Sequence, residues 1–332
     1  MKKCKLLLWA LALACSWILT GCRAANQIYS NMYIASIGFE HQEDEYTGYF
    51  FLPSSMSVGN TDSGSSDKSP SEIAVVRGKT IADVFNNLDL STTLKMNLKH
   101  ISSIVLHESI LNEKDLQDLM EYVKSSNTFD YNFYIFTTKD EIQEIYQVKN
   151  PNEESVILTM LCEPISSAYA YTAANPPHFL NFCRDYYNGK VLSFALIEPT
   201  KIWSEENDST YCRGVAFYKG GKLNIFGYEE EENFEFFKSN ASLSYSDAYI
   251  SVLFTDYQVK ISYKEEVNIT VKSKYKVLYS DMPAEKSYLE EKIQADMLAL
   301  IEKYEKDIDF LNLQYNASEH KNVKVSVDLK KS

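Results

Sequence analysis

Residues 72–147 carry the pattern that most limits the fold, because short apolar runs alternate there with stretches of helical periodicity. The pattern predicts strands at 72–76, 101–106 and 131–136, and helices at 80–88, 112–124 and 139–147. Thr80 and Asn112 stand where N-cap residues are expected, at the start of the two longer helices. Strands that alternate with amphipathic helices predict α/β layers.

Strand patterns dominate two other parts of the chain, one before residue 54 and one in the C-terminal third. Two runs at 32–40 and 46–53 predict a hairpin. The C-terminal third predicts a hairpin around Gly220-Gly221, several strands with period-2 alternation, one long amphipathic helix at 283–308 and a last strand at 323–329. We therefore expect an α+β, multi-domain protein, with an N-terminal mixed sheet with α/β layers and a C-terminal, largely antiparallel sheet with one long helix.

The expected domain boundaries follow these changes of pattern. They are a leader at 1–21, an N-terminal α/β domain at 22–148, a middle domain at 149–211 where the pattern is weak, and a C-terminal sheet-plus-helix domain at 212–332. Residues 54–70 are rich in Ser, Gly and Asp and almost free of large apolar groups. They predict a mobile loop, because little apolar burial would offset the entropy of ordering them.

The leader has a specific ending. Lys2, Lys3 and Lys5 precede an almost wholly apolar run from Leu6 to Leu19, which is too short to span a bilayer and is typical of a secretory signal peptide. Its last residues, Leu19-Thr20-Gly21-Cys22, resemble the bacterial lipobox. That motif implies cleavage between Gly21 and Cys22 and a diacylglyceryl group on the Cys22 thiol. The alternative is an ordinary signal peptide with an accidental cysteine.

Net charge limits the partners. The formal charge of −13 over 332 residues would become about −16 if the three leader lysines were removed. A body this acidic argues against nucleic-acid binding and against electrostatic docking on anionic lipid. The acidic run Glu229, Glu230, Glu231 and Glu232 is either a solvated face or a contact for a basic partner surface.

We find no complete catalytic or metal-binding pattern. His107 and Glu108 follow a predicted strand, where ligands often bind in α/β sheets, but no second histidine stands at metal-ligand spacing. His178 and Cys183 could be imagined as a nucleophile pair, yet no orienting partner is evident. The sequence therefore predicts no enzyme activity, no metal and no cofactor beyond the lipid. Cys162, Cys183 and Cys212 are left after the leader, so at most one disulfide could form, and three buried thiols are the alternative.

The order of several segments resembles the Ger(x)C family, the lipoprotein C subunits of spore germinant receptors. The lipobox is followed by the apolar strand `IASIGFE`, and Gly78-Lys79-Thr80-Ile81 opens a helix as in the family. His100 stands where the family has a histidine, and `RGVAFYKGGKLNIFGY` is similar to its Gly-x-Ala-x-Phe-Lys hairpin. Arg23-Ala24-Ala25 departs from the usual Trp-Asp-Arg after the lipid cysteine.

The resemblance implies a three-domain α+β protein without known catalytic activity. It also implies anchorage by the lipid on the outer face of the spore inner membrane, beside membrane-embedded A and B receptor subunits. Contact with a small nutrient ligand stays open. The alternatives are a solute-binding lipoprotein that feeds a transporter and a surface hydrolase, and the missing motifs disfavour the hydrolase.

Overall fold

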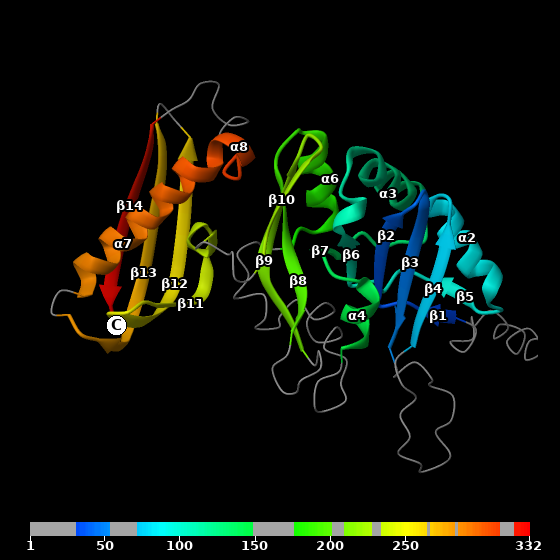
Figure 1. Ribbon diagram of the computed structural model, residues 1–332, viewed down its shortest axis with the longest axis horizontal. Coiled ribbons are helices and arrows are strands. Elements are labelled where there is room, and N and C mark those ends of the chain that lie inside the picture. Colours follow the sequence, from blue (N-terminus) through cyan, green and yellow to red (C-terminus); the bar gives the residue numbers. More distant parts are fainter. Residues whose placement is uncertain are drawn as a thin grey trace, which may run out of the picture.

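The computed structural model describes residues 31–53, 72–148, 176–200, 209–227, 234–263, 266–282, 285–312 and 322–332. An eight-stranded sheet has the order β10-β9-β8-β7-β6-β2-β3-β4, and a four-stranded sheet has the order β11-β12-β13-β14 (Figure 1). A short parallel pair joins β1 (Asn31–Tyr33) to β5 (Lys95–Asn97). The predicted α+β class, with a mixed first sheet and a second sheet that carries one long helix, is confirmed.

The first sheet begins as the predicted hairpin. β2 (Ser36–Gln42) and β3 (Glu45–Leu52) are antiparallel and joined by Glu43 and Asp44, which have positive φ angles of 48° and 66°. Two positive φ values are what a tight two-residue hairpin turn requires. β4 (Glu72–Gly78) then pairs with β3 and forms one edge of the sheet.

The centre of this sheet is parallel. β2, β6 (Ser103–His107), β7 (Tyr134–Thr138) and β8 (Leu192–Thr200) run side by side in the same direction. The predicted helices appear as α2 (Ile81–Ser91), α3 (Glu113–Ser125) and α4 (Ile142–Gln147). A further helix, α6 (Phe179–Tyr187), precedes β8. Thr80 and Asn112 cap α2 and α3 through their side chains, as expected. The α/β layers are thus confirmed.

The helices cover both faces of the sheet. Phe85 of α2, Leu116 of α3 and Phe179 of α6 share one core with Ile37 and Ile104 of the sheet. α4 lies on the opposite face, where Ile142 and Tyr146 pack against other strand residues.

Two residues of β2 fix the position of α4. A Cβ on Gly38 would lie 2.3 Å from Cγ2 of Ile142, so glycine is needed for the close approach of helix and strand. The Glu40 carboxylate accepts the backbone N–H of Ile142 at 3.1 Å and the Tyr49 hydroxyl at 3.0 Å. Glu40 thereby satisfies one of the amide groups that the start of a helix leaves without an intrahelical partner.

The hairpin around Gly220-Gly221 belongs to the first sheet. β9 (Ser209–Lys219) pairs antiparallel with β8, and β10 (Lys222–Phe226) pairs with β9. Both turn glycines have positive φ angles, 54° and 80°. The boundary expected between residues 211 and 212 falls inside β9, so these strands extend the N-terminal sheet instead of opening a C-terminal domain. Period-2 alternation identifies a strand but does not specify which neighbour it pairs with.

The second sheet contains β11 (Asn240–Ser246), β12 (Ile250–Tyr263), β13 (Val267–Ser280) and β14 (Val323–Lys331). β14 pairs with β13 in parallel after a crossover through α7 (Glu285–Leu300), while the other pairs are antiparallel. Leu289, Ile293 and Met297 of α7 are buried in this core, as the helical stripe predicted. The helix continues through a π-helical turn (Ile301–Glu305) into α8 (Lys306–Ile308).

An apolar cluster joins the two sheets. Leu300 and Ile308, near the end of the long helix, are buried together with Val215 and Phe217 of β9 and with Phe234. Figure 1 shows α8 beside the β9–β10 hairpin at this junction.

Several predictions fall outside the described residues. They include the leader, the loop at 54–70 and Cys162. Cys183 is a free, buried thiol.

Candidate functional site

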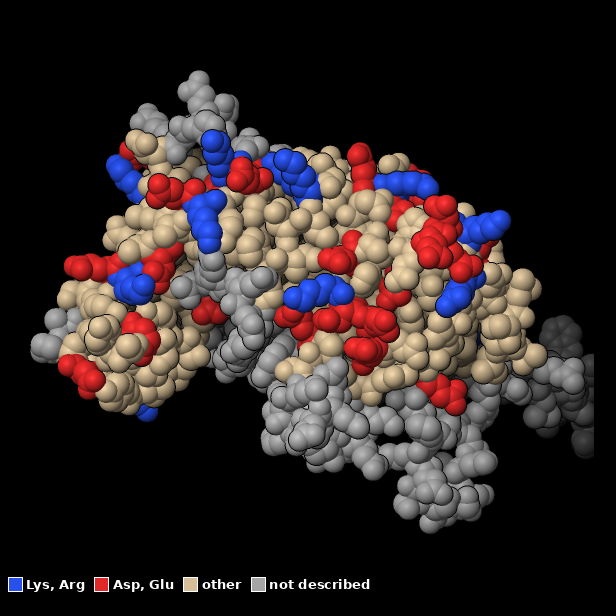
Figure 2. Space-filling model, in the orientation of Figure 1, with Lys and Arg blue, Asp and Glu red and all other residues tan. Residues whose placement is uncertain are grey.

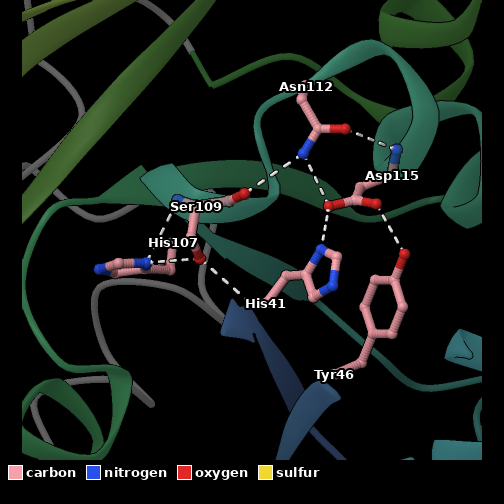
Figure 3. Close-up of polar contacts among 6 residues, drawn as sticks. All are labelled: His41, Tyr46, His107, Ser109, Asn112 and Asp115. Atoms are coloured by element: carbon pink, nitrogen blue, oxygen red, sulfur yellow. Dashed lines mark hydrogen bonds and ion pairs between the residues drawn. The ribbon is translucent and has the colours of Figure 1, made fainter. Parts of the chain in front are cut away.

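A polar cluster lies where β2 and β6 end and α3 begins (Figure 3). We call it the Asp115 cluster, and it contains His41, Tyr46, His107, Ser109, Asn112 and Asp115. The ends of adjacent parallel strands are the place where α/β sheets commonly bind ligands, so this cluster is the first site to test for chemistry.

Asp115 is the centre of the cluster. Its side chain is 1% exposed, and its Oδ2 lies 2.6 Å from Nδ1 of His41. Oδ1 accepts the Tyr46 hydroxyl at 2.6 Å, and Oδ2 also accepts the Asn112 side-chain amide at 2.7 Å. Three donors from the β2–β3 hairpin and from the helix start therefore converge on one buried carboxylate, which is how a buried charge is made tolerable.

Hydrogen bonds at the start of α3 also fix the position of Asp115. The backbone N–H of Asp115 donates to Oδ1 of Asn112 at 3.0 Å, while the Asn112 amide donates back to the Asp115 carboxylate. This is a reciprocal capping arrangement between the N-cap and the third helical residue. The sequence signal for this arrangement is an Asn-x-x-Asp spacing with the acidic residue beside the apolar stripe, and the periodicity of the helix alone does not reveal it.

The hairpin side of the cluster is fixed by ring stacking. The rings of His41 and Tyr46 stack with centroids 4.1 Å apart. Burial and the hydrogen bond to Asp115 raise the pKa of the Tyr46 hydroxyl above its usual range, so Tyr46 remains a protonated donor.

The serine and one histidine of the cluster contact each other within a single turn. Nδ1 of His107 accepts the backbone N–H of Ser109 at 3.2 Å, so that nitrogen must accept the Ser109 hydroxyl as well, at 2.8 Å. The Ser109 oxygen in turn accepts the backbone N–H of His41 at 3.1 Å. Contacts between residues two apart are those of a side-chain-stabilised turn. The predicted strand-end position of His107 is confirmed, and there the histidine closes the turn after β6.

A second polar feature lies over α4. In the face drawn in Figure 2, acidic side chains gather over α4 and β8. We call the group Asp140, Glu141, Glu144 and Glu198 the α4 acidic surface. Burial and the charge of Glu198 raise the pKa of Asp140. Lys139 lies 3.1 Å from Glu198 and offsets part of the negative charge.

The remaining candidate residues belong neither to the Asp115 cluster nor to the α4 acidic surface. His178 precedes α6 and its ring contacts Tyr134, while Cys183 is buried inside that helix. Burial raises the pKa of the Cys183 thiol to about 11, which leaves little thiolate to act as a nucleophile. Gly21, Cys22 and Glu229–Glu232 lie outside the described residues. In the described part of the chain, no group of three or more His, Cys, Asp or Glu side chains could hold a metal ion.

Comparison with protein families gives a match over residues 25–198 to the spore germination protein N-terminal domain. The match covers more than half of the chain and runs from before β1 into β8. The chain belongs to the Ger(x)C family of spore germination proteins. Family membership indicates a C subunit of a spore germinant receptor and association with a membrane.

Among solved structures, the chain is similar to the crystal structure of the GerBC protein. The two share 13% sequence identity, the comparison covers 89% of this chain and 96% of that chain, and the TM-score is 0.43. No curated protein sequence gives a significant match. Among the described helices of this Ger(x)C chain, none is both long and apolar enough to cross a membrane.

Proposed function

We propose that the chain is a lipid-anchored, non-catalytic subunit of a nutrient germinant receptor and acts by binding the membrane-embedded A and B subunits. The observation that carries the proposal is the family match over residues 25–198. The lipobox-like sequence Leu19–Cys22 immediately precedes the matched region and supports the anchor.

The anchor would hold the folded body close to the bilayer. Two acyl chains give stable attachment where one gives only reversible binding. The nine residues 23–31 can span no more than ~30 Å even when fully extended. A chain of net charge −13 is repelled by anionic lipid, so a resting place near the membrane needs attraction from another source. A protein partner with a basic surface would supply it.

Two acidic groups are candidates for that contact. Glu229–Glu232 remains a proposal from the sequence alone. The α4 acidic surface adds Glu141 and Glu144, both exposed, on the face of the first sheet opposite to α2, α3 and α6. Charges of this kind mainly guide the encounter of two proteins and their relative orientation.

The alternative of a solute-binding lipoprotein rests on a two-lobed α/β cleft. In the described residues, the first sheet has a parallel centre with helices on both faces, and the second sheet is mostly antiparallel. This arrangement favours the receptor subunit.

The test is co-purification from detergent-solubilised spore membranes with the full chain carrying an affinity tag. We expect the A and B subunits to co-purify with the wild type, and less of both with the double variant Glu141→Lys/Glu144→Lys. The matched control, Asp118→Lys/Glu121→Lys, reverses two exposed charges on α3 and should retain both subunits. Recovery of the wild type without either subunit would contradict the receptor proposal. Equal recovery by both double variants would contradict the role of the α4 acidic surface.

A further inference from the structure

The face of the second sheet that is turned away from α7 is rich in lysine. Successive side chains of a strand point to opposite faces. In β13, Val267, Ile269 and Val271 are buried in the core with α7, so the residues between them lie on the outer face. Figure 1 shows α7 lying across the inner face of this sheet. Six exposed lysines among the described residues lie on the outer face, and we call them the lysine face: Lys260, Lys272, Lys274, Lys276, Lys324 and Lys330.

Strand pairing places these lysines side by side. Lys272, Lys274 and Lys276 are alternate residues of β13, so their Cα atoms follow one another at intervals of about 7 Å. Lys330 of β14 is directly opposite Lys274. Like charges directly opposite each other on neighbouring strands destabilise a sheet. The stability of the sheet therefore does not account for this arrangement.

Acidic residues neutralise the lysine face in part. Nζ of Lys274 lies 3.2 Å from Oδ2 of Asp256, and Nζ of Lys324 lies 2.6 Å from Oε2 of Glu266. Asp328 of β14 is the third acidic residue of this face. Among the described residues, six lysines against three acidic residues give the face a net charge of +3.

The helical layer on the other side of the sheet has the opposite sign. Residues 285–308 contain seven Asp or Glu and four Lys, which gives a net charge of −3. This part of the chain is therefore polarised, and its positive side is turned away from the long helix. The net charge of −13 for the whole chain conceals the polarity, because it adds both sides together.

Two exposed apolar side chains border the lysine face. Leu278 and Tyr279 follow Lys276 near the end of β13, and they are 59% and 52% exposed. Tyr279 is paired with Ser251 of β12. A surface that combines lysines with exposed Leu and aromatic side chains is suited to a bilayer, because the ammonium groups attract anionic headgroups while the apolar groups enter the boundary below them.

We propose that the lysine face docks on anionic phospholipid headgroups of the membrane that holds the chain. The six lysines extend over three neighbouring strands, β12, β13 and β14, so a broad surface such as a bilayer can contact all of them at once. The proposal rests on the lipid anchor of the proposed function, because the anchor keeps the face within reach of the bilayer.

The anchor and the lysine face would hold the molecule at two points. β1 is the first described element after Cys22, and Figure 1 shows β1 and the second sheet toward opposite ends of the long axis. The molecule would therefore lie along the membrane. The α4 acidic surface faces the viewer in Figure 2, on the same side as α7, so docking through the lysine face would leave it accessible to a protein partner.

The acidity of the whole chain does not prevent this contact. The Debye length is about 8 Å at physiological ionic strength. A headgroup that touches the lysine face is therefore largely screened from the acidic side chains of the helical layer and of the α4 acidic surface, which lie on the far side of the molecule.

The experiment measures how fast a water-soluble acetylating reagent modifies each lysine of the acylated full chain on vesicles, with mass spectrometry of its peptides as the readout. The vesicles contain phosphatidylcholine alone or with about one third phosphatidylglycerol. We expect Lys272, Lys274 and Lys276 to be modified at least fivefold more slowly on the anionic vesicles. Lys286 of α7, which is 52% exposed, should react equally on both. Salt at 1 M should remove the difference, because the Debye length falls to about 3 Å.

A charge-removing variant tests whether the lysines act together. In Lys272→Gln/Lys274→Gln/Lys276→Gln, the remaining lysines Lys260 and Lys330 should be modified at equal rates on the two kinds of vesicle. Circular dichroism checks that the variant is folded, and exposed Lys-to-Gln changes leave the buried face of β13 intact.

The matched control is Lys286→Gln/Lys303→Gln/Lys306→Gln, which removes three exposed lysines from the helical layer and should retain slow modification of the lysine face on anionic vesicles. Loss of the chain from neutral vesicles would contradict the anchor, whereas equal rates on neutral and anionic vesicles would overturn the docking, so the two failures are distinguishable. Equal slowing at Lys286 would also overturn it. Slow modification that occurs in spore membranes but not on anionic vesicles would assign the lysine face to a protein partner instead.

Discussion

The ammonium of Lys219 lies 2.5 Å from Oδ2 of Asp309, and this ion pair joins the first sheet to the end of the long C-terminal helix. Lys219 ends β9, while Asp309 follows α8 and has a φ angle of 54° in the left-handed region. The Asp309 side chain is 2% exposed and that of Lys219 is 32% exposed. The buried Asp309 carboxylate therefore depends on the ion pair more than the partly exposed Lys219 ammonium does.

Replacement of Lys219 by Met should lower the free energy of unfolding by about 1–3 kcal/mol, because the buried Asp309 carboxylate would lose a charged donor. Urea denaturation of the full chain measures the change. Lys274→Met is the matched control, since Lys274 and its partner Asp256 are 59% and 66% exposed, and exposed pairs contribute only about 0–1 kcal/mol. Equal losses in the two variants would contradict the structural role of the Lys219–Asp309 pair.

Replacement of Asp115 by Ala should lower the free energy of unfolding by on the order of 3 kcal/mol, because His41, Tyr46 and Asn112 would lose their common acceptor. The measurement is denaturant unfolding, together with hydrogen exchange at the start of α3, which should become faster. Asp118→Ala removes an exposed acidic side chain from the same helix and should have little effect. If both variants unfold alike, the Asp115 cluster does not stabilise the hairpin and helix as we infer.

The lowered pKa of Asp247, which lies between β11 and β12, predicts that the stability of the fold depends on pH. Burial acts to raise its pKa, but hydrogen bonds from Tyr288, Tyr245 and two backbone amides outweigh that effect and hold the pKa at about 2. A carboxyl whose folded pKa lies below its unfolded value of about 3.9 stabilises the fold above that pH and loses its contribution as the pH falls toward 2.

The Tm of the wild type should therefore exceed that of Asp247→Asn at pH 6, and the difference should shrink between pH 4 and pH 2. Differential scanning calorimetry at these pH values measures it. Glu291→Gln removes an exposed carboxylate from α7 and should leave the Tm nearly unchanged from pH 6 to pH 2. A gap that stays constant from pH 6 to pH 2 would show that Asp247 does not have a depressed pKa.

Replacement of Cys22 by Ala should release the chain from spore membranes and remove a diacylglyceryl mass from its N-terminus, because the lipid would have no thiol to attach to. Membrane fractionation and intact-mass measurement test both parts. Cys183→Ala is the control, since that thiol is buried in α6 and should not affect membrane attachment. Retention of Cys22→Ala in the membrane with an unchanged mass would contradict the lipid anchor.

Local patterns were sufficient for most elements of the chain. The stripe Leu116, Leu119, Met120 and Val123 identified α3, and Asn112 identified its first turn. In β13 the period-2 alternation puts Val267, Ile269 and Val271 on one face, and that face is buried. The alternation in β12 is interrupted at Asp256, which adopts a positive φ of 55° at an irregularity in the pairing, yet Ile250–Tyr263 forms one strand. Such a backbone distortion has little signal in side-chain periodicity.

The sequence alone also predicted the α/β layers and the hairpin at Gly220-Gly221, since each of their elements is specified by residues close together in the chain. The family was predicted from the order of such segments along the chain. Only the tertiary structure decided that β9 and β10 extend the first sheet, that His41 and Tyr46 meet Asp115, and that Lys219 meets Asp309. The partners in the last pair are 90 positions apart. Strand pairing and buried ion pairs arise from the packing of whole layers, and the period of a side-chain pattern specifies which face is buried but not which distant residue will cover it.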